Sequence, residues 1–151
     1  MVTRVLVAVD DSPASLAAAR LAVELAGGWG ATVRAITVLA DGALVESIES
    51  VRPGSEPELR IGEAGASLLA HVRGLGEQAG VSVEPLVRSG VPYRCILDEA
   101  AAWPADIVVM GRSDRTGPAS PYVGSEVARV LEFADCPVLV VPRWSARSGP
   151  P

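Results

Sequence analysis

Apolar residues along the chain occur in short continuous runs, and segments with helical periodicity lie between these runs. A continuous apolar run is typical of a strand covered on both faces of a parallel sheet. Continuous runs of this kind predict strands over residues 5–9 and 138–141, and strands are also predicted over residues 32–38 and 106–110. A further strand is predicted over residues 82–87, where Pro85 favours a position at the sheet edge because proline cannot donate to the hydrogen-bond ladder.

The segments between the strands predict helices. Ser12 is suited to cap a helix whose first residue is Pro13, and apolar residues recur at helical spacing until Gly27 and Gly28, where we expect this helix to end. The later helices are predicted at the apolar stripe Ile61, Leu68, Val72 and Leu75, over residues 92–103 and over residues 124–134. Residues 40–57 are rich in Gly, Pro, Ser and acidic residues and lack a period, so they predict an excursion rather than a linker between domains.

Strands that alternate with crossover helices predict an α/β fold. We expect a single doubly wound domain with a five-stranded, mostly parallel sheet and helices on both faces. A chain of 151 residues with 49% apolar content can bury one such core. In open sheets of this kind, ligands bind beyond the carboxyl ends of the strands, at the point where the strand order reverses.

A glycine-rich stretch follows the fourth predicted strand. Residues 108–125 read VVMGRSDRTGPASPYVGS, an apolar run followed by a loop and a Gly-Ser pair at a predicted helix start. Glycine allows positive φ and close approach to a ligand, and the first N–H groups of a helix attract anions such as phosphate. The chain has neither GxxxxGK[ST] nor GxGxxG, and a dinucleotide fold uses the first strand-to-helix turn. The pattern therefore predicts a mononucleotide site.

This spacing resembles that of the universal stress protein family. Nucleotide-binding members of the family share G-x-x-G, nine residues and then G-[ST], and Gly111, position 114, Gly124 and Ser125 fall at these places. The opening VLVAVDDS and the later CPVLVVP are similar to the family's first and last strands. The resemblance implies the strand order 3-2-1-4-5, with the reversal between strands one and four. It also implies a nucleotide-binding domain over residues 1–142, followed by a tail at 143–151.

The resemblance implies roles for particular residues. Asp10 would contact ribose hydroxyls, the backbone of Val38 would contact adenine, and Ala8 with Met110 would give the base an apolar surface. Gly111, Gly124 and Ser125 would hold phosphates. The full set of nucleotide-binding candidates is Ala8, Asp10, Val38, Met110, Gly111, Arg112, Asp114, Gly124, Ser125 and Glu126.

These residues also have structural explanations that need no ligand. Asp10 is able to cap the turn beside Ser12, and Ser125 is able to cap the last helix. Gly111 is able to form only a turn. The apolar candidates Ala8, Val38 and Met110 are also ordinary core residues.

Asp114 departs from the family pattern, which has glycine there. A carboxylate about 4 Å from a phosphate charge interacts with it by roughly 4 kcal/mol at an effective dielectric near 20. Arg112 and Arg115 would neutralise this charge, or Mg²⁺ would bridge it to phosphate. We therefore expect ATP or AMP as the ligand, with or without Mg²⁺.

Composition narrows the function classes. The net charge is -5, with 13 Lys plus Arg and 18 Asp plus Glu, which disfavours a general nucleic-acid surface. The apolar runs are shorter than a membrane span or a signal sequence requires, so we expect a cytoplasmic protein without a membrane partner. The two cysteines, Cys95 and Cys136, lack metal-ligand spacing and are expected to be buried, reduced thiols.

Little in the sequence predicts catalysis. The single histidine, His71, lies on a predicted helix away from the strand ends, and no GxSxG motif or metal-ligand cluster is present. Whether the protein is an enzyme stays open. The sequence is compatible with at most slow ATP hydrolysis, and no catalytic residue can be named.

The preferred hypothesis is a regulatory stress-response module that binds an adenine nucleotide and acts through ligand-dependent assembly or partner contact. The alternatives are a dimeric family member that binds no nucleotide and acts as an interaction module, or a weak ATP hydrolase. The apolar strand Val138–Val141 would lie at a sheet edge, where its unpaired backbone groups favour a homodimer.

Overall fold

The computed structural model describes residues 1–39, 57–112 and 123–143. Its elements are β1 (Arg4–Ala8), α1 (Pro13–Trp29), β2 (Thr32–Leu39), α3 (Pro57–Ala79), β3 (Val83–Ser89), α4 (Pro92–Ala102), β4 (Ile107–Gly111), α5 (Ser125–Phe133) and β5 (Val138–Val141). The strands form one five-stranded sheet with the order β3-β2-β1-β4-β5, and every neighbouring pair is parallel. The expected α/β fold and the strand order implied by the resemblance are both confirmed.

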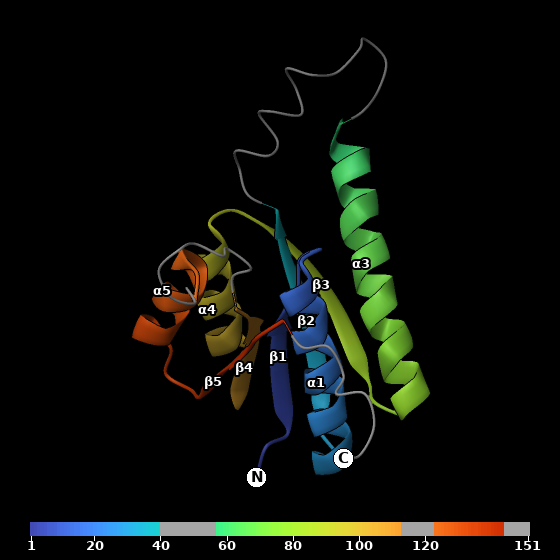
Figure 1. Ribbon diagram of the computed structural model, residues 1–151, viewed down its shortest axis with the longest axis vertical. Coiled ribbons are helices and arrows are strands. Elements are labelled where there is room, and N and C mark those ends of the chain that lie inside the picture. The colour runs from blue at the N-terminus through green and yellow to red at the C-terminus, as the bar shows by residue number, and fades with distance from the viewer. Residues whose placement is uncertain (40–56, 113–122, 144–151) are drawn as a thin grey trace.

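Helices cover both faces of the sheet (Figure 1). Helices α1 and α3 pack on one face, and α4 and α5 pack on the other. The central strand β1 supplies both cores: Val5 and Val7 face α1 and α3, whereas Leu6 faces the side of α4 and α5. All three side chains are fully buried, which explains why β1 is an uninterrupted apolar run.

Helix α1 ends later than its glycine pair predicts. Ser12 is the N-cap, with its Oγ accepting a hydrogen bond from the Ser15 N–H at 3.2 Å, and Pro13 is the first helical residue, as expected. The helix then continues through Gly27 and Gly28 to Trp29. It ends at Gly30, which has φ 66° and donates its N–H to the Ala26 carbonyl. An interior glycine weakens a helix only by about 1 kcal/mol, whereas a left-handed residue ends it.

The strands and helices α4 and α5 agree with the predictions to within two residues at each end, whereas α3 extends beyond the predicted stripe Ile61 to Leu75 at both ends. Pro85 lies within β3, which is an edge strand, as predicted. In α3, Val72 is buried, and Leu68 and Leu75 pack against the same core, while the side chain of Ile61 lies outside the described part. The predicted excursion at 40–57 ends one residue too late, because Pro57 is the first residue of α3; residues 40–56, and residues 144–151 of the predicted tail at 143–151, are outside the described part. Within the described residues, no helix has the length and apolar content needed to cross a bilayer.

A charged network fixes α4 against the sheet. The Arg34 guanidinium, on β2, makes ion pairs with Glu84 of β3 at 2.7 Å and with Glu99 of α4 at 2.5 Å. The same guanidinium lies 4.4 Å from the centre of the Trp103 ring. Glu99 is buried, with 8% of its surface exposed, so the ion pair compensates a charge that would otherwise be costly to bury.

Candidate functional site

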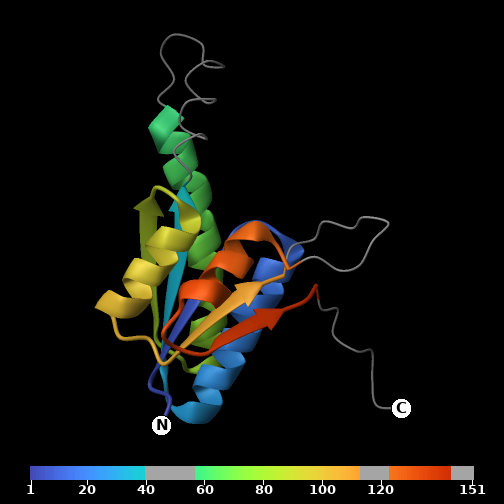
Figure 2. The same ribbon diagram turned by 90° about the vertical axis from the view of Figure 1, so that its left-hand side faces the viewer.

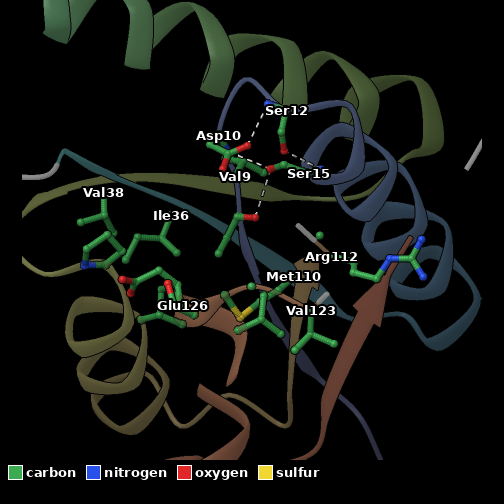
Figure 3. A pocket seen from close by; sticks show the side chains of 17 residues that line it. Val9, Asp10, Ser12, Ser15, Ile36, Val38, Met110, Arg112, Val123 and Glu126 are labelled. Carbon is green, nitrogen blue, oxygen red and sulfur yellow. Dashed lines mark hydrogen bonds between the residues drawn. The ribbon is translucent and has the colours of Figure 1, made fainter. Parts of the chain in front are cut away.

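A pocket of about 360 Å³ lies at the carboxyl ends of β1 and β4, where the strand order reverses. Its size is within the usual range for small-molecule sites. The lining residues come from β1, β2 and β4 and from the chain around the N-termini of α1, α4 and α5 (Figure 3). They are Ala8, Val9, Asp10, Ser12, Ser15, Ile36, Val38, Pro92, Ile96, Met110, Gly111, Arg112, Val123, Gly124, Ser125, Glu126 and Val127.

The fold brings the sequence candidates together. Those that line the pocket are Ala8, Asp10, Val38, Met110, Gly111, Arg112, Gly124, Ser125 and Glu126. The remaining candidate, Asp114, lies outside the described residues. Residues more than 100 positions apart in the chain thus share one cavity because β1 and β4 are neighbours in the sheet.

Asp10 forms the turn that follows β1. Its Oδ1 accepts a hydrogen bond from the Ser12 N–H at 2.8 Å, and its own N–H donates to Ser15 Oγ at 2.7 Å (Figure 3). The capping role beside Ser12 is therefore present. The side chain is nevertheless exposed, and Oδ2 makes no hydrogen bond to any other described residue. One carboxylate oxygen is thus available to a ligand while the other holds the turn.

Ser15 is a pocket residue that the sequence reasoning did not identify. Only 3% of its surface is exposed, and its Oγ donates to the Ala8 carbonyl at 3.4 Å while accepting from the Asp10 N–H. Its signal in the sequence is a hydroxyl on the otherwise alanine-rich buried face of α1. Ser15 joins the end of β1 to the first turn of α1 and thereby positions Asp10.

Gly111 is required by packing rather than by a turn. It is the last residue of β4, paired with Val141, and its φ is not in the left-handed region. A Cβ at this position would lie 2.5 Å from the Ser15 nitrogen and 2.6 Å and 2.8 Å from the Ala14 carbonyl carbon and oxygen. The alternative explanation that Gly111 only forms a turn is wrong, because the close approach of β4 to the first turn of α1 leaves no space for a side chain.

The start of α5 has the features of an anion site. Gly124 has φ 101°, a conformation that favours glycine, and it is the N-cap of the helix. Ser125 is the first helical residue, so the alternative explanation that it only caps α5 is wrong. Because glycine has no side chain, no side-chain hydrogen bond caps this helix. The first residues of α5 line the pocket, so the positive end of the helix dipole lies at the pocket wall.

An apolar wall forms another part of the pocket. Ile36, Ile96 and Met110 are buried in the core on the side of α4 and α5, and Ala8 and Val38 pack against them half-buried. Met110 is 5% exposed, so it is mainly a core residue. The wall offers a flat aromatic ligand an apolar contact surface without a separate aromatic platform.

Besides Asp10, two charged side chains line the pocket, Arg112 and Glu126, and they lie on opposite sides of it. Figure 3 shows Glu126 on the side of Val38 and Ile36, with Arg112 across from it. Oε2 of Glu126 accepts a hydrogen bond from the Tyr93 backbone N–H at 2.7 Å. This carboxylate therefore serves the N-terminus of α4, a structural role that its sequence context did not indicate.

Outside the pocket, the described histidine and cysteine side chains do not form a second site with one another. His71 is exposed on α3 and is not among the lining residues. Cys95 and Cys136 are half-buried thiols, and burial raises the pKa of the Cys136 thiol. Among the described residues, no group of three or more His, Cys, Asp or Glu side chains is placed to hold a metal ion.

Comparison with known proteins places this arrangement in a family. The universal stress protein family model matches residues 1–142. A universal stress protein of Methanocaldococcus jannaschii is 33% identical over 138 residues, covering 91% of this chain and 81% of that protein.

Solved structures share the fold. A universal stress protein in complex with cAMP superposes with a TM-score of 0.70 at 22% identity, covering 95% of this chain and 98% of the other. The universal stress protein of Archaeoglobus fulgidus in complex with dAMP gives 0.64 at 23% identity, covering 93% and 98%. Because the family model spans nearly the whole domain and the relative from M. jannaschii is similar over most of both chains, this chain belongs to the universal stress protein family.

Proposed function

We propose that residues 1–142 bind an adenine nucleotide in this pocket and act as a cytoplasmic regulatory module of the stress response, through ligand-dependent assembly or partner contact. The observation that carries the proposal is the composition of the pocket. A carboxylate acceptor, an apolar wall and the uncapped start of α5 surround one cavity of about 360 Å³. These features match the three chemical parts of a nucleotide.

Each part of the nucleotide has a counterpart in the pocket. The base lies against the apolar wall beside the backbone of Val38, and the ribose hydroxyls donate to Asp10 Oδ2. The phosphate accepts from the first N–H groups of α5, and Arg112 adds a positive charge. Two structural relatives are described in complex with cAMP and dAMP, both of which carry adenine and a single phosphate. These complexes support an adenine nucleotide as the ligand and leave the choice between AMP and ATP to the binding experiment.

Calorimetry with ATP, ADP and AMP, each with and without Mg²⁺, tests binding directly. Mass spectrometry of small molecules released from freshly purified protein identifies a ligand carried from the cell. The absence of both heat and a thermal shift at millimolar nucleotide would reject the proposal. Asp10→Ala should weaken the binding of all three nucleotides alike because they share the ribose. Asp11 is an exposed neighbour that does not line the pocket, so Asp11→Ala should leave the three affinities unchanged.

We also propose that two copies pair through β5. Figure 2 shows β5 at the edge of the sheet, beyond β4. Val138, Leu139 and Val140 are only half-buried there, and an edge strand offers unpaired backbone groups to a second copy. Light scattering at several protein concentrations tests this, because a monomer mass throughout rejects the dimer. If Val140→Lys leaves a dimer intact, the interface lies elsewhere.

The rival function is a dimeric interaction module that binds no nucleotide. The residue that favours it is Asp114, which stands where the resemblance to nucleotide-binding family members implies glycine. A dimer by light scattering with no calorimetric response to any nucleotide would support this rival. A slow ATP hydrolase is distinguished from both by turnover that stays constant per molecule through successive purification steps.

A further inference from the structure

Glu126 has an unusual position for a carboxylate in an anion-binding pocket. It is half-buried in the first turn of α5, and its Oε2 is fixed at 2.7 Å from the backbone nitrogen of Tyr93 in the first turn of α4. Val91, the N-cap of α4, makes no side-chain hydrogen bond to its own helix. The Glu126 carboxylate takes this place and is stabilised by two helix N-termini, so it is held in one position on the pocket wall.

This carboxylate keeps unused acceptor capacity. An ionised carboxylate offers about four lone-pair directions, and the Tyr93 N–H occupies one of them. No other described residue donates a hydrogen bond to Glu126, although the residue lines the cavity. It lies on the side of Ile36 and Val38, within the apolar part of the pocket, and Arg112 is on the opposite side (Figure 3). A fixed group that can only accept hydrogen bonds thus borders the surface proposed for the base.

We infer that Glu126 is a specificity-determining residue that accepts a hydrogen bond from the exocyclic amino group of the base. The inference rests on the proposed function, since it assigns the base to the apolar wall. A base without an amino group at this point leaves the half-buried carboxylate without that donor. A base carbonyl at the same place sets two acceptors against each other with no proton between them. Glu126 therefore favours 6-aminopurine nucleotides.

The decisive ligand pair is AMP and purine riboside 5′-monophosphate, which differ only by the exocyclic amino group. A hydrogen bond to a charged acceptor corresponds to a preference of about tenfold or more for AMP, measured as the ratio of Kd values by calorimetry. This comparison uses the wild-type protein and needs no variant. A ratio near one in the wild type overturns the inference, while failure of both ligands to bind rejects the proposed function itself.

Glu126→Gln then assigns the preference to this side chain. Glutamine retains a carbonyl oxygen for the Tyr93 N–H, so α4 stays capped, but its amide NH₂ is directed at the base and is a donor. The AMP preference should fall to about one. Glu132→Gln, on the exposed part of the same helix and away from the pocket, is the matched control and should keep the wild-type ratio.

Two results with Glu126→Gln contradict the inference. A preserved AMP preference places the amino group elsewhere in the pocket. Equal tightening of both ligands shows that the carboxylate faces the phosphate, because removal of the negative charge would then favour any nucleotide alike.

Discussion

Replacement of Gly111 by alanine should destabilise the fold even when no nucleotide is present. The new Cβ would lie 2.5–2.8 Å from three backbone atoms of Ala14 and Ser15. Backbone atoms in the first turn of a packed helix cannot move aside as the end of a side chain can. The structure therefore has to separate β4 from α1, and overpacking of this kind costs about 1–3 kcal/mol.

The magnitude should lie toward the upper end of that range, at about 3 kcal/mol, because three contacts are violated together. For a chain of this length, 1 kcal/mol shifts Tm by about 2–4 °C, so Gly111→Ala should lower Tm by about 6–12 °C. Thermal unfolding followed by circular dichroism measures this shift. Gly74→Ala is the matched control, since a Cβ at this position in α3 meets nothing within 4 Å. It should stabilise the protein by about 0.5–1 kcal/mol.

One result would refute this reasoning. If Gly111→Ala keeps the wild-type Tm but loses nucleotide binding, the glycine serves the ligand and the contact with α1 is unimportant. If Tm falls in the absence of nucleotide, the packing of β4 on α1 is the reason for glycine. The same displacement should also weaken binding, because Ser15 positions Asp10 through the hydrogen bond at 2.7 Å.

Three other predictions concern charged residues. Glu99→Ala leaves Arg34 without its buried partner and should lower the free energy of unfolding in urea by about 2 kcal/mol, whereas loss of an exposed partner such as Glu84 should cost less than about 1 kcal/mol. Hydrogen bonds from the backbone N–H groups of Thr3 and Arg4 lower the pKa of Asp106. The stability that Asp106 contributes is therefore complete above its unfolded pKa, near 4, and is lost as the pH falls through its lower folded pKa. Asp106→Asn should remove this part of the acid transition, which Tm measured between about pH 2 and 5 will show. Asp114→Gly should raise the affinity for ATP relative to AMP, because a like charge near the phosphates is removed; an unchanged ratio by calorimetry would place that side chain away from them.

The strands were predictable because a strand that is buried on both faces needs apolar residues at successive positions. In β1, Leu6 and Val7 point to opposite cores, and both must be apolar. The order of the strands is different, since no local pattern says which strands are neighbours, and it came from the family resemblance. The end of α1 was misjudged because Gly27 and Gly28 keep helical backbone angles, while Gly30 adopts the left-handed conformation that ends the helix.

The candidate site was predictable where one segment carries the whole signal. A glycine directly before a predicted helix, such as Gly124, indicates a backbone conformation that other residues rarely adopt. The apolar run before Asp10 indicates that a strand ends there. The reason for Gly111 was not predictable, because the atoms that exclude a side chain belong to α1, almost 100 residues earlier. The hydrogen bond between the Tyr93 N–H and Glu126 joins residues 33 positions apart on two helices, so it could not be predicted from the sequence around either residue.

The cap that α4 receives from α5 links two positions during evolution. The Val91 side chain has no oxygen to cap its own helix, so the carboxylate of residue 126 serves in its place. A relative with Ser, Thr, Asp or Asn at the position of Val91 would have its own cap and would be free to lose the carboxylate. Positions 91 and 126 should therefore covary among homologues. Where the capping residue has moved to position 91, the nucleotide pocket should carry one negative charge less and should have lost its means of distinguishing one purine from another.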